Sequence, residues 1–283
     1  MLRHVEKKPY LVTLWGSDVK LDDIDGWKNV DNHIKKVSKE YNLENVVVKS
    51  NFRSIIHEGK LSNLVKDSGD GWWHGFQHGV AIIGHMAPIA NMLNLKYAYI
   101  ASSYPQKMKG QYTCASDPSI DNFVRYSGCQ TIHDGCELDR QEKIRFLVSK
   151  KKEGYPISLR VCWISSGGKN CCRCEKCYRT ILEIVSEAGN PNEYGFIWDE
   201  KAIAHCKKDM LTKLEIKDFQ IEQYYRPLSK IFIQNKSRIL EFDKYKWLLN
   251  MDFSRFNNYP MKKIRRTFLY RGLRKIYRIL IKK

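Results

Sequence analysis

The pattern of hydrophobic and polar positions changes several times along this 283-residue chain, and each stretch with one pattern predicts a strand or a helix. Short apolar runs predict buried strands at residues 10–15, 45–50, 96–104 and 129–135. Apolar residues at helical spacing, with lysines on the opposite face, predict a helix at residues 27–41 along the stripe Trp27, Val30, Ile34, Val37 and Tyr41. Further helices are predicted at residues 72–94, from residue 138 onward, and at residues 175–188.

The order of these elements predicts an α/β fold. Strands that alternate with helices are typical of a Rossmann-like parallel sheet with helices on both faces. Ligands of such sheets bind beyond the carboxyl ends of the strands. The polar residues that follow the predicted strands are therefore candidates for binding a nucleotide or substrate: Ser17, Asp18, Ser102, Ser103, His133 and Asp134.

The charge of the chain is strongly positive, with 49 Lys and Arg against 31 Asp and Glu. Residues 261–283 hold ten of these cations and no acid. Leu269, Leu273, Ile276 and Leu280 would form an apolar stripe on a helix there. Such a segment suits an anionic membrane surface or RNA phosphates, or it docks on its own domain with its lysines in water.

The first residues, MLRHVEKKPY, lack the apolar core of a signal peptide. The longest apolar run, residues 80–93, is too short to span a bilayer. We therefore expect a cytoplasmic protein with reduced thiols, and peripheral attachment to a membrane is the alternative.

Five of the nine cysteines fall within sixteen positions, in the stretch RVCWISSGGKNCCRCEKCYRT. Four of them have the spacing C-x8-C-x2-C-x2-C: Cys162, Cys171, Cys174 and Cys177. A strand would bring in the first and a tight turn the other three, which predicts a structural zinc site with four thiolates. Lys169, Arg173, Lys176 and Arg179 would offset its negative charge. The remaining cysteines, Cys114 among them, are predicted to be bystanders.

Alternatives to zinc at this cluster are an iron–sulfur centre and buried cysteines without a metal. The SSGGK stretch at residues 165–169 resembles a phosphate loop, but it only spans the gap between two predicted ligands.

Two further groups are candidates for binding a substrate or pyrophosphate. Arg140 and Lys143 share one face of the helix after residue 138, although a solvated charged face is equally consistent with them. His74 and His78 have the spacing i, i+4 of a metal site but lack the acidic residue of H-E-x-x-H. His74, near the start of its helix, is kept as a candidate for the substrate pocket.

The motifs WHG, YIASSY, HDG, R-x2-K, RVCW and NCCRCEKCYRT, in this order, resemble the 7-cyano-7-deazaguanine synthase-like branch of the N-type ATP pyrophosphatases. The resemblance runs from about residue 1 to 185, and the cysteine array is its most specific part. It implies an adenine-nucleotide α-hydrolase sheet. The implied chemistry is adenylation of a carboxylate or carbonyl oxygen by ATP, followed by attack of a nitrogen nucleophile on a small-molecule substrate.

The SGGxDS loop that holds the ATP phosphates in that family does not occur in this sequence. The expected organisation is an α/β domain at residues 1–155 without its first strand and phosphate loop, a zinc module at 156–190, and a helical basic region at 191–283. ATP and magnesium are expected only where that loop is present. The expected function is an adenylating ligase, truncated or degenerate, or else a zinc-stabilised module that binds a membrane or RNA. A sulfur-transfer enzyme with an iron–sulfur cluster is a third hypothesis.

Overall fold

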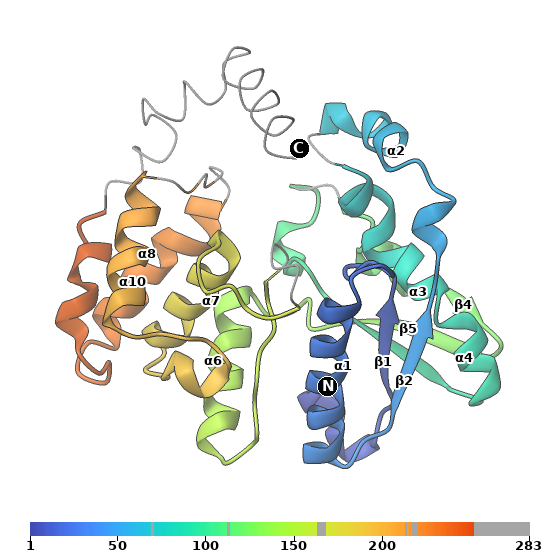
Figure 1. Cartoon of the computed structure of the whole chain (residues 1–283), viewed down its shortest axis with the longest axis horizontal. Coiled ribbons are helices and arrows are strands. Elements are labelled where there is room, and N and C mark those ends of the chain that lie inside the picture. Colours follow the sequence, from blue (N-terminus) through green and yellow to red (C-terminus); the bar gives the residue numbers. More distant parts are fainter. Residues whose placement is uncertain are drawn as a thin grey trace. The chain divides into compact units, whose positions relative to one another are not determined.

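The computed structural model (Figure 1) describes residues 1–68, 71–111, 114–162, 168–212, 214, 216 and 220–251. The chain divides into two compact units. The first comprises Met1–Lys143 with Ser166–Lys169, and the second comprises Ile144–Ser165 with Asn170–Lys283. The four cysteines of the predicted zinc module and the helical region that follows them therefore share one unit. The basic segment 261–283 lies outside the described residues.

The first unit is α/β, and it contains all four predicted strands. Strand β1 (Leu11–Trp15) pairs in parallel with β2 (Asn45–Lys49), from Leu11 opposite Asn45 to Trp15 opposite Lys49. Strand β3 (Tyr97–Ala101) pairs in parallel with β5 (Cys129–Asp134), and the short β4 (Arg125–Tyr126) joins β5 in the antiparallel sense. The α/β class is confirmed.

The pairing differs from the single sheet predicted. Within the described residues, ladder hydrogen bonds form two sheets of order β1-β2 and β3-β5-β4. Each predicted strand finds a parallel partner, but no described ladder joins the two pairs.

The helix between β1 and β2 agrees closely with its prediction. Helix α1 (Ile24–Tyr41) is capped by Asp23, whose side chain accepts a hydrogen bond from the Gly26 amide at 2.9 Å. It ends at Tyr41 and is followed by the cap residue Asn42, which adopts the left-handed conformation. Trp27, the first residue of the predicted stripe, stacks on Trp15 of β1 with ring centroids 4.7 Å apart. The stripe thus packs α1 against its own sheet (Figure 1).

The predicted continuous helix at residues 72–94 is wrong. A π-helical segment, Trp73–Ala81, is followed by the short helices α3 (Ile82–Gly84) and α4 (Ala87–Met92). The break occurs at His78 (φ −76°, ψ 97°) and Gly79 (φ 121°, ψ −111°). A Cβ on Gly79 would lie 2.3 Å from the carbonyl oxygen of Ala115, so this close approach of two backbones requires glycine.

Short elements complete the first unit. The 3-10 helices are Leu2–Lys7, Phe52–Ser54, Lys66–Ser68 and Gln106–Met108, and the α-helices are α2 (Glu58–Leu64) and α5 (Pro118–Asp121).

The second unit is helical and is built around α7 (Glu175–Ser186), in which every residue from Cys177 to Ser186 is buried. Its other elements are α6 (Arg140–Lys152), whose first turn belongs to the first unit, α8 (Glu200–Thr212), α10 (Arg226–Gln234), the π-helical Ile221–Tyr225, and the 3-10 helices Pro191–Tyr194 and Phe242–Leu248. Helix α7 ends at Ser186, two residues before the predicted end at residue 188, because Ala188 takes the left-handed conformation (φ 58°) that closes it. None of the described helices is both long and apolar enough to cross a membrane.

Candidate metal centre and strand-end site

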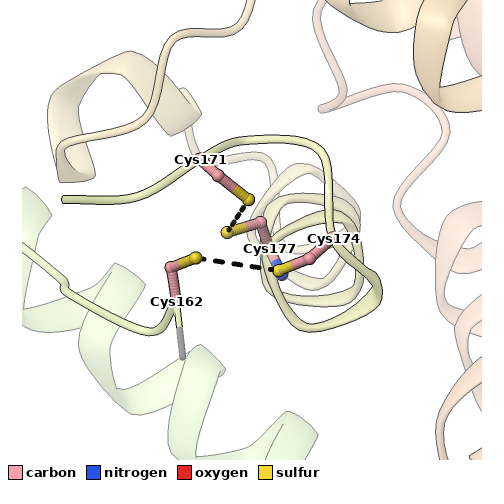
Figure 2. Close-up of side chains that lie close together, drawn as sticks. All are labelled: Cys162, Cys171, Cys174 and Cys177. Atoms are coloured by element: carbon pink, nitrogen blue, oxygen red, sulfur yellow. Dashed lines mark hydrogen bonds between the residues drawn. The ribbon is translucent and has the colours of Figure 1, made fainter. Parts of the chain in front are cut away.

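The four predicted ligands lie together at the start of α7. Figure 2 shows the sulfur atoms of Cys162, Cys171, Cys174 and Cys177 turned toward one another, and all four lie within 4.8 Å of each other. The Sγ atoms of Cys162 and Cys174 are 4.0 Å apart, and those of Cys171 and Cys177 are 3.9 Å apart. The clustering predicted from the spacing is therefore confirmed.

Helix α7 positions two of these ligands through its first turn. Cys174 is the N-cap residue, and its Sγ accepts a hydrogen bond from the Cys177 amide at 3.4 Å. Cys171 Sγ likewise accepts from the Arg173 amide at 3.4 Å. Amides at a helix start and in a tight turn stabilise negative charge on sulfur, which favours the thiolate form that binds metals.

Asn170 positions the remaining ligand, and sequence reasoning missed it. Its Oδ1 accepts hydrogen bonds from the amides of Val161 (2.9 Å) and Cys162 (3.3 Å). Its Nδ2 donates to the carbonyl oxygens of Leu159 (2.8 Å) and Gly195 (3.1 Å). Residues 159–162 form no strand, contrary to the prediction, and the Asn170 side chain takes the hydrogen bonds that a neighbouring strand would make.

The protonation of the cluster is uneven. Hydrogen bonding from the Cys177 thiol lowers the pKa of Cys174 to about 5. Burial raises the pKa of Cys171 to about 11. Donation to Cys174, together with burial, raises the pKa of Cys177 as well. Cys174 therefore loses its proton more readily than Cys171 and Cys177 do.

This arrangement fits one metal ion. Four thiolates around a tetrahedral zinc ion, with Zn–S bonds of roughly 2.3 Å, place their sulfurs about 3.8 Å apart. The Cys162–Cys174 and Cys171–Cys177 separations agree with that value. An iron–sulfur cluster distributes its cysteines over different iron atoms, so close packing of all four sulfurs favours a single ion.

Two neighbours have other roles. Cys172 Sγ accepts from the Ile197 amide at 3.3 Å, so this cysteine supports the loop and does not join the ligands. Arg179 is buried, lies 3.6 Å from Glu175 and stacks over the ring of Tyr224 at 4.1 Å. Its charge is balanced by Glu175, which weakens its predicted part in offsetting the thiolates.

A second group of polar residues gathers where strands of the first unit end. Ser17, after β1, is buried, and its Oγ accepts from Nε2 of Gln77 at 3.4 Å. His78 directly follows Gln77, and its imidazole lies 3.3 Å from Oγ of Ser103, after β3. Consecutive residues of the segment Trp73–Ala81 therefore contact the carboxyl ends of β1 and β3. Asp18 is exposed, and His74 lies on the same segment as His78.

The ends of β3 and β5 bring three predicted residues together. Lys143 Nζ donates to Ser102 Oγ at 2.6 Å and to the Ser102 carbonyl oxygen at 3.2 Å. Gly135 lies between strand and helix, since a Cβ there would be 3.5 Å from Lys143 Cε and 3.7 Å from Ser102 Oγ. Asp134 is half-buried and pairs with Arg3 Nη1 at 3.2 Å.

The pKa of Lys143 lies below that of an ordinary lysine. Burial is the largest cause, and the positive charge of Arg140 lowers this pKa further. Arg140 begins α6, one turn before Lys143, and is close enough for its charge to act on that lysine. Arg3 belongs to this group as well, and no sequence signal could have found it, because it is distant in sequence from Asp134.

His133 has a different environment from the one predicted. The alternating burial of β5 turns it inward, and its side chain is only 1% exposed. Its Nδ1 lies 2.7 Å from Oδ2 of Asp121, which also accepts from Ser116 Oγ at 3.0 Å. This residue contributes to the interior of the first unit and not to a surface that a substrate reaches.

Comparison of the chain with protein-family models, with curated proteins and with solved structures finds no significant match in any of them.

Proposed function

We propose that this chain supplies the strand-end site and a structural zinc centre of an ATP-dependent adenylating ligase, similar to the 7-cyano-7-deazaguanine synthase-like ATP pyrophosphatases. The observation that carries the proposal is the contact of Lys143 with Ser102 beside Gly135 and Asp134. Cations and hydroxyl groups at the carboxyl ends of adjacent parallel strands are what a nucleotide or an acidic substrate requires in α/β proteins.

The proposed architecture is one Rossmann-like sheet. The carboxyl ends of β1 and β3 contact two consecutive residues of one segment. Gln77 bonds to Ser17, after β1, and His78 bonds to Ser103, after β3. One more parallel strand between β1 and β3 would join the two sheets, and the crevice at that position would bind the nucleotide. In the 7-cyano-7-deazaguanine synthase-like family, the SGGxDS phosphate loop follows such a strand. That motif does not occur in this sequence.

The residues present would bind and orient the substrate. Lys143, Arg140 and Arg3 would neutralise a phosphate or carboxylate, and Ser102 would donate a hydrogen bond to it. Asp18, exposed after β1, would contact the nucleoside, and the buried Ser17 beside it would hold this turn through its bond to Gln77. The four cysteines would bind zinc, which fixes the start of α7 and takes no part in adenylation.

The experiment is to isolate the protein from its native cell, determine its intact mass and N-terminal sequence, and assay pyrophosphate release from ATP. The proposal expects a segment with SGGxDS and pyrophosphate release that falls when Lys143→Met is introduced. Lys107→Met, at an exposed lysine, is the matched control. A native protein without that segment, and without ATP binding in equilibrium dialysis, would refute the proposal.

The excess of cations over acids favours a second candidate, a zinc-stabilised module that binds an anionic membrane or RNA. Its test is the salt dependence of binding to phosphatidylserine vesicles and to single-stranded RNA. Removal of residues 261–283 should abolish that binding, and retention of full binding would refute this candidate.

A further inference from the structure

A second group of metal-ligating side chains lies in the first unit. His74, His78 and Cys114 place ligand atoms within 4.8 Å of one another, and among the described residues only the four-cysteine cluster also does so. The Nδ1 of His78 is 3.3 Å from the Sγ of Cys114. The rings of His74 and His78 have centroids 5.5 Å apart. The spacing of the histidines alone had not indicated a third ligand.

The backbone holds this group together at two points. The Ala115 amide, directly after Cys114, donates to the carbonyl oxygen of His74 at 2.7 Å. Gly79, directly after His78, approaches the carbonyl oxygen of Ala115 so closely that a Cβ would lie 2.3 Å from it. The non-helical backbone at His78 and Gly79 therefore lets the segment beside Cys114 pack against both histidines.

We infer that His74, His78 and Cys114 form a second metal site, which binds a divalent ion with zinc-like ligand preferences and keeps one coordination position open. Two imidazoles and one thiolate are ligands that zinc favours, and three protein ligands with an open fourth position are typical of catalytic sites. Ser103 Oγ, 3.3 Å from the His78 ring, would hydrogen-bond a water or substrate oxygen at that position.

Metal binding here would replace the contact between His78 and Cys114. The imidazoles bind as neutral ligands and the thiol binds as thiolate, so the thiol proton is released to solvent when the ion enters. The two centres then differ chemically. The four-cysteine centre is closed to outside ligands, whereas the His74–His78–Cys114 centre admits one.

This inference does not depend on the proposed function, and its test needs no enzyme assay. The full chain is prepared metal-free, titrated with Co2+ and Zn2+, and analysed for bound metal. Two equivalents are expected for the unaltered protein, one for each cluster. Cys114→Ser and His74→Ala should each retain one equivalent. The matched controls Cys136→Ser and His205→Ala, at residues outside both clusters, should retain two.

Two readouts on the unaltered protein avoid any dependence on how the variants fold. Azide should change the visible spectrum of the Co2+ form, because only the second centre has an open position. Zinc should also protect Cys114 from alkylation after the first equivalent has bound. A single equivalent in the unaltered protein, a spectrum that azide leaves unchanged, or a Cys114 alkylation rate that zinc does not affect would each overturn the inference.

Discussion

Lys143 and Ser102 are 41 residues apart in the sequence, yet Lys143 Nζ lies 2.6 Å from Ser102 Oγ at the end of β3. The contact places a half-buried ammonium group where a parallel strand ends. Burial, and then Arg140, lower its pKa, so this lysine loses its charge at a lower pH than an ordinary lysine does.

The first prediction compares Lys143 with Lys107. Hydrogen bonding to Asp139 raises the pKa of Lys107, in contrast to Lys143. Only the neutral amine is acylated, so the midpoint of acetylation against pH should lie lower for Lys143 than for Lys107. Competitive labelling with acetic anhydride and peptide mass spectrometry measures both lysines in one sample. The pH midpoints of acetylation are compared rather than the acetylation rates, because burial also slows the access of acetic anhydride to Lys143. Equal midpoints would contradict the assigned environment of Lys143.

The second prediction concerns metal removal at the four-cysteine centre. Cys171→Ser should abolish metal binding there and lower the melting temperature of the second unit, because structural zinc contributes directly to folding. The neighbouring Cys172→Ser is the matched control. Its Sγ accepts from the Ile197 amide and donates to the Asn170 carbonyl oxygen at 3.8 Å, and a serine hydroxyl can take both roles. Bound metal and circular dichroism against temperature measure the result. Equal metal loss in both variants would show that the ligand assignment is wrong.

The third prediction tests Asn170 as a positioning residue. Asn170→Asp keeps the acceptor for the amides of Val161 and Cys162 but loses both donors to backbone carbonyl groups. Loss of such supporting bonds weakens metal affinity about 10-fold or more. A competition titration with a chromophoric chelator measures it.

Asn192→Asp provides the control for Asn170→Asp. Asn192 makes comparable bonds to the Trp198 backbone in the same unit. It should lose stability without loss of metal affinity. If both variants bind metal as tightly as the unaltered protein, Asn170 does not position Cys162.

Local patterns predicted the parts of this molecule whose causes are local. The stripe of α1 and the apolar runs of the four strands follow from side-chain period, and the ligand spacing of Cys171, Cys174 and Cys177 follows from one turn and the first turn of α7. Pairing between strands is a long-range property, and so the division into two sheets had no local signal.

The missed features depend on contacts between distant segments. Cys114 lies 36 residues from His78, and its place beside the histidines is set by backbone contacts that no periodicity reveals. The break at Gly79 has the same origin. From the sequence, a glycine within an apolar run only permits a break in the helix. In the structure, the close approach of the Ala115 backbone requires glycine at this position.

The fourth prediction uses that requirement. Gly79→Ala forces a side chain into a left-handed backbone conformation and toward the Ala115 carbonyl oxygen, so the first unit should lose roughly 1–3 kcal/mol of unfolding free energy. Gly84→Ala is the matched control. A Cβ there meets nothing within 4 Å, and alanine gains up to about 1 kcal/mol over glycine in a helix. Urea unfolding should therefore show a lower midpoint for Gly79→Ala and an equal or higher one for Gly84→Ala. A Gly79→Ala midpoint equal to that of the unaltered protein would mean that the segments carrying His78 and Cys114 are not held together by this close approach.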